Sequence, residues 1–265
     1  MTHHPGVPSP DAVWAALRAE ADALAAREPF LVATIRQLVP RDGRLSDVIA
    51  RRLSSLLQQP DIGRDDLLSL FGGVMTAAPQ IEEFAAHDLH AVRSRDPACS
   101  SHLHATLNYK GFQALQAYRI AHDLWDAGRV ELASWLSNRV SVVLGPDIHP
   151  AARLGKGIML DHGSGIVVGE TAVIEDGVSI LQGVTLGGTG KDTGARHPVI
   201  RHGVMIGAGA KILGRIEIGA ESKVAAGSVV LKDVPARCTV AGVPAQIVRF
   251  HAPHEVPAAA MIQDI

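Results

Sequence analysis

The chain has 265 residues, which allows a sizeable core and a second domain. Its 25 Lys and Arg residues are matched by 27 Asp and Glu residues, so the formal net charge of −2 leaves no positive excess for binding a nucleic-acid backbone. The N-terminus MTHHPGVPSP lacks the segments of an export signal, and no run approaches the ~20 apolar residues that span a bilayer. The two isolated cysteines suit a reducing compartment. Composition therefore predicts a soluble cytoplasmic protein without nucleic-acid or membrane partners.

The N-terminal half has the pattern of helices from Ser9 onward. Ser9 can cap a helix, Pro10 suits the first helical position, and Asp11 complements the helix dipole. Apolar residues then recur at intervals of three and four, as in Trp14, Leu17, Ala21 and Leu24. We expect residues 1–8 to be a disordered tail and residues 9–143 to form an all-α domain.

Near Asp147 this helical spacing gives way to a pattern in which an aliphatic residue recurs at every sixth position, which we call the six-residue beat. Counted in sixes, twelve of thirteen positions carry Ile, Leu or Val, the set being Ile148, Leu154, Leu160, Ile166, Ala172, Val178, Val184, Ile200, Ile206, Ile212, Ile218, Val224 and Val230. Such a beat predicts short strands joined by tight turns, which coil into a three-sided parallel β-helix with the aliphatic residues inside. We expect this domain to span residues 144–248, with the Gly-rich, polar run 188–199 leaving it as a loop.

Several segments of this half resemble the serine acetyltransferase family. They are Asp147-Ile-His-Pro-Ala-Ala, Leu160-Asp-His-Gly-Ser-Gly, Thr185-Leu-Gly-Gly-Thr-Gly-Lys and Arg196-His-Pro, joined in the helical half by Arg95-Asp-Pro-Ala and Tyr109-Lys-Gly-Phe-Gln. The resemblance implies an α+β fold in which the all-α domain precedes a left-handed β-helix of hexapeptide repeats. It also implies transfer of an acetyl group from acetyl-CoA to L-serine, the first step of cysteine biosynthesis from serine, by a trimer or hexamer.

A general base is needed because the neutral hydroxyl of serine is a poor nucleophile, and histidine has a suitable pKa. The resemblance assigns this role to His162 and the role of its orienting carboxylate to Asp147. Asp147 lies fifteen residues before His162, close to one coil of the prism, so the two can stack on neighbouring turns.

Four further residues could hold the amino-acid substrate. Asp96 and Asp161 can receive its ammonium group, and Arg196 offers a planar fork for its carboxylate, with His197 alongside. The family pattern implies the same roles. Each residue also has a structural explanation, as a turn former, a loop charge or a helix start.

Acetyl-CoA needs a narrow groove more than charged groups, because its pantetheine arm is thin and rich in amides. Small residues could line such a groove and lysines could meet its phosphates, the candidates being Gly187, Gly188, Ala208, Gly209, Ala226 and Lys223. Small residues would equally fit tight coils without a ligand. No metal is expected.

Three other functions fit part of the pattern. A γ-type carbonic anhydrase would bind zinc through His149, His162 and either His197 or His202, but the expected ligand spacing is not evident. A hexapeptide O-acetyltransferase for a sugar or antibiotic would keep His162 without needing Asp96. A binding scaffold would not need the pair of Asp147 and His162.

Residues 249–265 fall outside the six-residue beat and contain prolines, which favours a flexible tail. The chain ends at Ile265, whose carboxylate beside an aliphatic side chain is a compact recognition tag. The resemblance implies that this tail docks into O-acetylserine sulfhydrylase. L-Cysteine, which differs from serine by sulfur for oxygen, is expected to inhibit by competing with serine.

Overall fold

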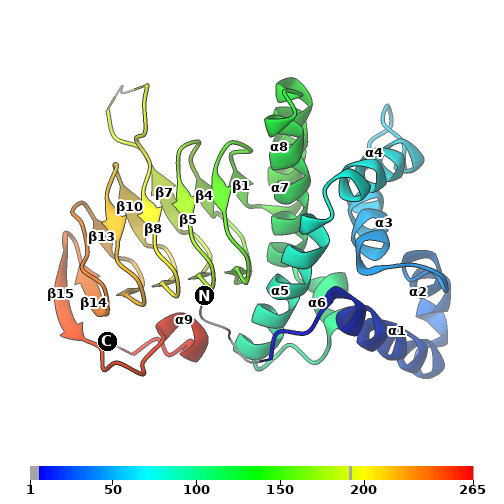
Figure 1. The fold of residues 1–265 in the computed structure, drawn as a ribbon, viewed down its shortest axis with the longest axis horizontal. Coiled ribbons are helices and arrows are strands. Elements are labelled where there is room, and N and C mark those ends of the chain that lie inside the picture. Colours follow the sequence, from blue (N-terminus) through cyan, green and yellow to red (C-terminus); the bar gives the residue numbers. More distant parts are fainter. Residues whose placement is uncertain (1–5, 191–192, 265) are drawn as a thin grey trace.

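The computed structural model describes residues 6–190 and 193–264 of the chain. A helical domain lies beside one end of a three-sided prism of short strands, and α7 and α8 stand across the first coil (Figure 1). Of the N-terminal tail expected to be disordered, residues 1–5 lie outside the described residues. None of the described helices is both long and apolar enough to cross a bilayer.

The helical domain begins where the sequence predicts. Ser9 Oγ accepts a hydrogen bond from Ala12 N at 3.2 Å, and Pro10 is the first helical residue. The helices are α1 (Pro10–Arg27), the 3-10 turn η1 (Pro29–Leu31), α2 (Val32–Leu38), α3 (Leu45–Leu57), α4 (Arg64–Ala77), α5 (Gln80–Arg95), α6 (His102–Asn108), α7 (Lys110–Asp126) and α8 (Val130–Leu144). At the end of α8, Gly145 has a φ of +102°, a conformation that glycine adopts readily, and the chain turns into the prism.

Each face of the prism is a sheet whose strands come from successive coils. Face 1 has the order β1-β4-β7-β10-β13, face 2 the order β2-β5-β8-β11, and face 3 the order β3-β6-β9-β12-β14 with β15 at its edge. The strands are β1 (Asp147–Ile148), β2 (Arg153–Leu154), β3 (Met159–Leu160), β4 (Val167–Val168), β5 (Val173–Ile174), β6 (Ser179–Ile180), β7 (Thr185–Gly187), β8 (Val199–Ile200), β9 (Met205–Ile206), β10 (Lys211–Leu213), β11 (Glu217–Ile218), β12 (Lys223–Val224), β13 (Val229–Val230), β14 (Cys238–Gly242) and β15 (Ala245–Phe250). All pairs are parallel except β14 with β15.

Three corners connect these faces, and the turns of successive coils stack along each. The 3/1 corner contains residues 161–166, 181–184, 207–210 and 225–228. The 1/2 corner contains residues 149–152, 169–172, 188–198 and 214–216, and the 2/3 corner residues 155–158, 175–178, 201–204 and 219–222. The loop expected at 188–199 leaves the prism at the 1/2 corner, and its residues 191–192 lie outside the described residues (Figure 1).

The six-residue beat has the right period, but its phase slips at one turn. Ile148 pairs with Val168, twenty residues later, whereas Val168 pairs with Leu186, eighteen residues later. The turn at 161–166 is therefore two residues longer than the one stacked on it at 181–184. Counting in sixes misses this insertion because the residue before each strand also faces inward, so that Ile166 and Val168 are 0% and 2% exposed.

The C-terminal segment packs on face 3. β15 carries regular structure to Phe250, beyond the domain end expected at residue 248, because it pairs antiparallel with β14. The short helix α9 (Pro257–Ala260) follows, and its Ala258 is fully buried against Leu181 and Met205. Ser179 Oγ donates a hydrogen bond to Ala258 O at 3.0 Å. The described part of the segment thus lies along the prism.

A buried carboxylate joins the two domains. Asp88 of α5 is fully buried, and its Oδ2 accepts hydrogen bonds from Arg119 Nη2 at 2.7 Å, Arg119 Nε at 3.0 Å and Gln116 Nε2 at 3.0 Å. Its Oδ1 accepts a hydrogen bond from Ile158 N at 3.0 Å, while Arg119 Nη2 also donates to Gly155 O at 2.8 Å. Asp88 therefore ties α5 and α7 to the first turn of the 2/3 corner.

Replacing Asp88 should destabilise the protein strongly, because it leaves the Arg119 guanidinium buried without its counter-charge. We expect Asp88→Ala to lower the free energy of unfolding by about 3–5 kcal/mol, measured by urea denaturation. Arg249→Ala is the matched control, because its 2.6 Å ion pair with Glu255 is largely exposed to solvent and contributes little. Equal urea midpoints for Asp88→Ala and the wild type would contradict this role.

Candidate active site

His162 lies in the two-residue insertion of the 3/1 corner. Its φ is +54°, in the left-handed region that a non-glycine residue seldom occupies. The turn is tight, with Gly163 N donating to Asp161 O at 2.6 Å, and the side chain of His162 is 73% exposed. Strained residues of this kind gather at functional sites, and this one projects its imidazole into solvent.

The start of α7 holds this turn from the helical domain. Lys110 Nζ contacts Ser164 Oγ, and the backbone at Gly111 approaches Leu160 O so closely that a Cβ added there would lie 2.0 Å from that oxygen. A Cβ on Gly163 would come within 3.1 Å of Gly111 Cα. Glycine is required at both positions because two backbones meet there.

Two carboxylates lie near this turn, and Tyr109 fixes one of them. Tyr109 Oη donates to Asp96 Oδ2 at 2.7 Å, and Asp96 Oδ1 accepts a hydrogen bond from Ala98 N at 2.8 Å. Asp161 Oδ1 lies 3.9 Å from His162 Nε2. Burial raises the pKa of Asp161, and the negative charge of Asp96 adds to this, while His162 opposes it. The structure therefore brings Asp96, Asp161 and His162 together, with Tyr109 as a member that sequence reasoning missed.

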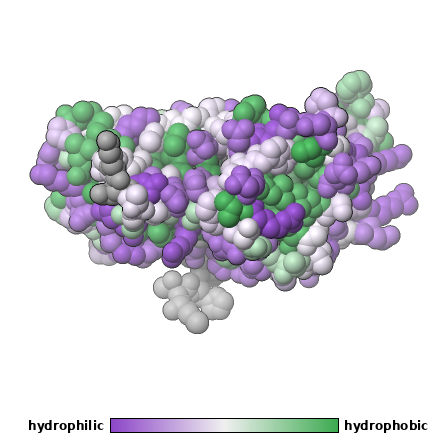
Figure 2. Space-filling model, turned by 90° about the horizontal axis from the view of Figure 1, so that it is seen from above, coloured by the Kyte–Doolittle hydropathy of each residue, from purple (hydrophilic) through white to green (hydrophobic). Residues whose placement is uncertain are grey.

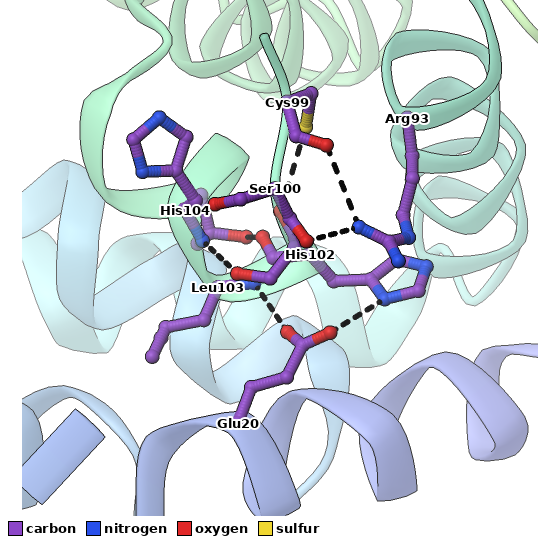
Figure 3. Close-up of polar contacts among 9 residues, drawn as sticks. Glu20, Arg93, Cys99, Ser100, His102, Leu103 and His104 are labelled. Atoms are coloured by element: carbon purple, nitrogen blue, oxygen red, sulfur yellow. Dashed lines mark hydrogen bonds and ion pairs between the residues drawn. The ribbon is translucent and has the colours of Figure 1, made fainter. Parts of the chain in front are cut away.

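The loop that carries Asp96 is anchored at its far end (Figure 3). Glu20 of α1 accepts a hydrogen bond from Leu103 N at 2.8 Å through Oε2, and its Oε1 lies 3.3 Å from His102 Nδ1. Arg93 Nη1 donates to Ser100 O at 2.5 Å. Sequence reasoning also missed Glu20, since it acts across 83 residues of chain and no local pattern signals the contact.

Asp147 lies on the coil next to the turn that carries His162, but its partner in the sheet is a different residue. It pairs in register with Val167, and its N donates to Ile166 O at 2.8 Å. Its side chain is exposed, and no contact between Asp147 and His162 is found among the described residues. Its charge instead acts on His149, whose pKa is lowered by burial while Glu170 and Asp147 raise it. The insertion at 161–166 contributes two residues to this offset, because Val167 lies five residues after His162.

Arg196 and His197 form a second cluster at the 1/2 corner. Arg196 Nη2 donates to Glu170 Oε2 at 2.6 Å, and its backbone N donates to Thr171 Oγ1 at 2.9 Å. His197 is 7% exposed, and its Nδ1 accepts a hydrogen bond from Thr171 N at 3.1 Å. Burial lowers the pKa of His197, and the charge of Arg196 lowers it further. Within one chain, face 1 separates this cluster from His162.

The residues expected to bind acetyl-CoA are likewise found at different corners and faces of the prism. Ala208, Gly209 and Ala226 lie on the 3/1 corner, which also carries His162. A column of left-handed glycines follows that corner, with φ values between 68° and 72° at Gly165, Gly183, Gly209 and Gly227. This column leaves room for a thin chain to lie along the backbone.

The remaining candidates for acetyl-CoA lie elsewhere. Gly187 ends β7, and Gly188 lies beside the Arg196 side chain in the 1/2 corner. Lys223 is only 5% exposed, and its Nζ donates to Ile262 O at 2.9 Å and also to Asp264 O. In this conformation Lys223 binds the C-terminal segment.

The described residues offer no group of three metal-ligating side chains. The histidines that a zinc lyase would need are dispersed, because His149 and His197 lie at the 1/2 corner, His162 at the 3/1 corner and His202 at the 2/3 corner.

Comparisons with known proteins agree along the chain. Residues 13–117 match the family model for the N-terminal part of serine acetyltransferase, and residues 197–232 match the bacterial transferase hexapeptide model. The chain is 53% identical over 236 residues to the serine acetyltransferase of Salmonella typhimurium, which covers 89% of this chain and 86% of the relative. The solved serine acetyltransferase of Vibrio cholerae superimposes with a TM-score of 0.94 at 47% identity, over 97% of this chain and 99% of that one.

Other solved serine acetyltransferases contain ligands. The Brucella abortus enzyme in complex with coenzyme A has a TM-score of 0.88 at 49% identity, covering 91% of this chain and 96% of that one. A serine acetyltransferase in complex with cysteine has a TM-score of 0.93 at 48% identity, covering 96% and 98%. The Neisseria gonorrhoeae enzyme in complex with serine has a TM-score of 0.87 at 49% identity, covering 89% and 97%. The expected fold, a helical domain followed by a left-handed β-helix of hexapeptide repeats, is confirmed.

Proposed function

This chain belongs to the serine acetyltransferase family and transfers the acetyl group of acetyl-CoA to L-serine, and we propose that His162 is the general base of the reaction. The observation that carries the proposal is an exposed imidazole on a strained turn, 3.9 Å from the carboxylate of Asp161. Histidine has the pKa that a base needs near neutral pH.

His162 would accept the proton of the serine hydroxyl while the hydroxyl oxygen bonds to the acetyl carbonyl carbon. Collapse of the resulting tetrahedral adduct breaks the carbon–sulfur bond, and His162 returns the proton to the sulfur of CoA. Asp147 would orient the imidazole, which requires its exposed side chain to come into contact with His162. The residues of this site would therefore act by accepting and returning a proton.

Asp96 and Asp161 would bind the substrate ammonium. Burial raises the pKa of Asp161 and the negative charge of Asp96 adds to this, so a cation between the two carboxylates would stabilise both. Tyr109 would keep Asp96 in place through its 2.7 Å hydrogen bond. A solved relative in complex with serine supports serine as the substrate.

Arg196 and His197 would bind the substrate carboxylate from a neighbouring protomer. They lie on the 1/2 corner and His162 on the 3/1 corner, so face 1 prevents them from meeting within one chain. A threefold assembly can bring the 3/1 corner of one chain against the 1/2 corner of the next. Exposed apolar side chains such as Val142 and Val167 support association, and Figure 2 has apolar patches on both halves of the molecule. We propose trimers, which the helical domains join into a hexamer.

The same interface would hold acetyl-CoA. Ala208, Gly209 and Ala226 would line the groove on the side of His162, while Gly187 and Gly188 would approach from the loop side. The complex of a relative with coenzyme A supports the use of acetyl-CoA. Lys223 would reach the ligand only after release of the C-terminal segment.

L-Cysteine would inhibit by occupying the serine site. It carries the same ammonium and carboxylate, so Asp96, Asp161 and Arg196 would bind it while its thiol takes the place of the reacting hydroxyl. A solved relative in complex with cysteine supports this proposal. We further propose a cytoplasmic location, which agrees with the free thiols of Cys99 and Cys238.

Loss of the base tests the proposed mechanism directly. We expect His162→Ala to lower kcat with serine by about 10²–10⁴-fold, and Asp147→Asn to lower it less, because the base remains and only its orientation suffers. CoA release measured with acetyl-CoA and serine reports both. His254→Ala, a change in an exposed tail residue, is the control and should retain activity. If His162→Ala retains more than about a tenth of the wild-type turnover, another group is the base.

Mixing two inactive variants tests the shared site. His162→Ala and Arg196→Ala should each be nearly inactive alone, because each disables every interface. After unfolding and refolding together, about a quarter of the interfaces should combine an intact His162 corner with an intact Arg196 corner, and that share of activity should return. A site formed within a single chain predicts no recovery, because no chain in the mixture carries both residues.

We also propose that the C-terminal tail binds O-acetylserine sulfhydrylase through Ile265, a residue outside the described ones. The chain immediately before it lies against face 3, where Lys223 binds Ile262 O. Binding to the sulfhydrylase would therefore require this segment to leave face 3, and the terminal carboxylate would then imitate that of the partner's amino-acid substrate.

Deleting Ile265 should abolish co-elution with the sulfhydrylase and leave acetyltransferase activity intact. A peptide of the last ten residues should inhibit the sulfhydrylase competitively with O-acetylserine, whereas a scrambled peptide of equal composition should not. Co-elution that survives the deletion would show that the tail is not the binding element.

A further inference from the structure

A cleft follows the 2/3 corner, away from the corners that carry His162 and Arg196. Its volume is about 1210 Å³, and it lies between α5, the first turns of that corner and the C-terminal segment. We call it the corner cleft, and its charged or titratable lining side chains are His87, His90, Arg95, His122, Arg153, Lys156, Glu175, Asp176, His202 and Glu221. None of them has a role in the proposed reaction.

The carboxylates of the corner cleft are already engaged by the protein. Glu175 Oε1 accepts a hydrogen bond from Arg201 Nη1 at 2.7 Å. Asp176 Oδ1 accepts a hydrogen bond from Lys156 N at 2.8 Å, and Glu221 Oε2 lies 2.8 Å from Arg237 Nη1. Arginine side chains therefore neutralise Glu175 and Glu221, whereas Asp176 accepts a bond from a neutral amide and keeps its negative charge.

Its cations are less well compensated. Arg95 donates only to neutral acceptors, Ser179 Oγ at 3.0 Å and Val178 O at 3.4 Å. Within the described part of the chain, Arg153 and His90 have neither a hydrogen-bonded nor an ion-paired side-chain partner. Lys156 is paired with Glu83 at 2.8 Å, which leaves Arg95, Arg153 and His90 as the groups without a counter-charge in contact.

The environment of His90 lowers its pKa. Burial lowers the pKa of His90, and Arg95, His102 and His87 each lower it further, with no acidic group acting in the opposite direction. Burial likewise lowers the pKa of Arg95 to about 10, with only the charge of Asp88 opposing. A partly buried guanidinium beside a cluster of histidines is costly unless an anion neutralises it.

We propose that the corner cleft binds an oxyanion of the phosphate class at Arg95 and His90. The planar guanidinium suits the two oxygens of a phosphate or sulfate group, and imidazole supplies a further donor. The cleft has room for more than a single ion, so the group can be inorganic phosphate or the phosphoryl end of a larger metabolite.

This site would lie one residue from the proposed serine site. Arg95 faces the cleft, whereas Asp96 accepts the hydrogen bond of Tyr109 beside His162. Ser179, which accepts a hydrogen bond from Arg95, donates to Ala258 O in the C-terminal segment. An anion bound to Arg95 would thus contact a side chain that is linked to the C-terminal segment through Ser179 and is next to Asp96 in the chain. Anion binding itself does not depend on the proposed mechanism.

Equilibrium dialysis of labelled inorganic phosphate against the full-length protein tests the proposal. CoA is omitted, because its own phosphates would compete for the corner cleft, and chloride holds the ionic strength constant. We expect one saturable site per chain, with affinity lowered by about tenfold or more in Arg95→Gln and to a lesser degree in His90→Gln. Arg215→Gln is the matched control, because Arg215 likewise donates to neutral acceptors, Thr171 O and His197 O, but lies at the 1/2 corner. Circular dichroism checks that each variant is folded.

Displacement identifies the source of the anion. Sulfate should compete with phosphate, and tighter competition by glycerol phosphate would favour a phosphorylated metabolite over the free ion. The proposal is overturned if no saturable binding is found, if folded Arg95→Gln and His90→Gln both bind as the wild type does, or if Arg215→Gln alone removes binding.

Discussion

The buried contact of Asp88 with Arg119 sets the relation between the two halves of this protein. Asp88 receives hydrogen bonds from α7 and from Ile158 of the first coil, so a single carboxylate fixes α5, α7 and the prism relative to one another. Such a pair contributes little net stability compared with apolar packing, but it defines geometry, because either charge alone would be buried at high cost. The proposed active site depends on that geometry, since Asp96 comes from the helical half and Asp161 from the prism.

The coils of the prism are regular, and the proposed site lies at the turn that departs from this regularity. Eighteen-residue coils keep aliphatic side chains on the axis, as in the register of Val168 with Leu186. Two additional residues at 161–166 push His162 outward into a left-handed conformation, and the glycines of α7 and of the same turn allow the helical domain to approach it. A strained loop on a rigid scaffold is a common way to present a reactive side chain.

The three corners differ in the charged side chains that lie on them or beside them. The 3/1 corner and its neighbouring loop hold the carboxylates Asp96 and Asp161, whereas the 1/2 corner holds Arg196 beside Glu170. An amino acid carries both charges, so the proposed site needs both corners, which the assembly of several chains would provide. Beside the 2/3 corner, α5 presents Arg95, which has no carboxylate in contact among the described residues, and this lack is the basis of the proposed anion site.

The sequence alone determined the class of each half and the kind of chemistry. Helical spacing and the Ser9 cap predicted the first domain, the beat of aliphatic residues predicted the prism, and the segments around Asp147, His162 and Arg196 indicated the family. Tertiary structure decided which of these residues meet: it separated Arg196 from His162 by a face, paired Asp147 with Val167 without a contact to His162, and brought in Tyr109 and Glu20. The physical reason is that periodicity reports only which side chains face the axis, a short-range property. The corner on which a residue lies depends on the summed length of all preceding turns, and contacts between domains depend on packing across distant parts of the chain.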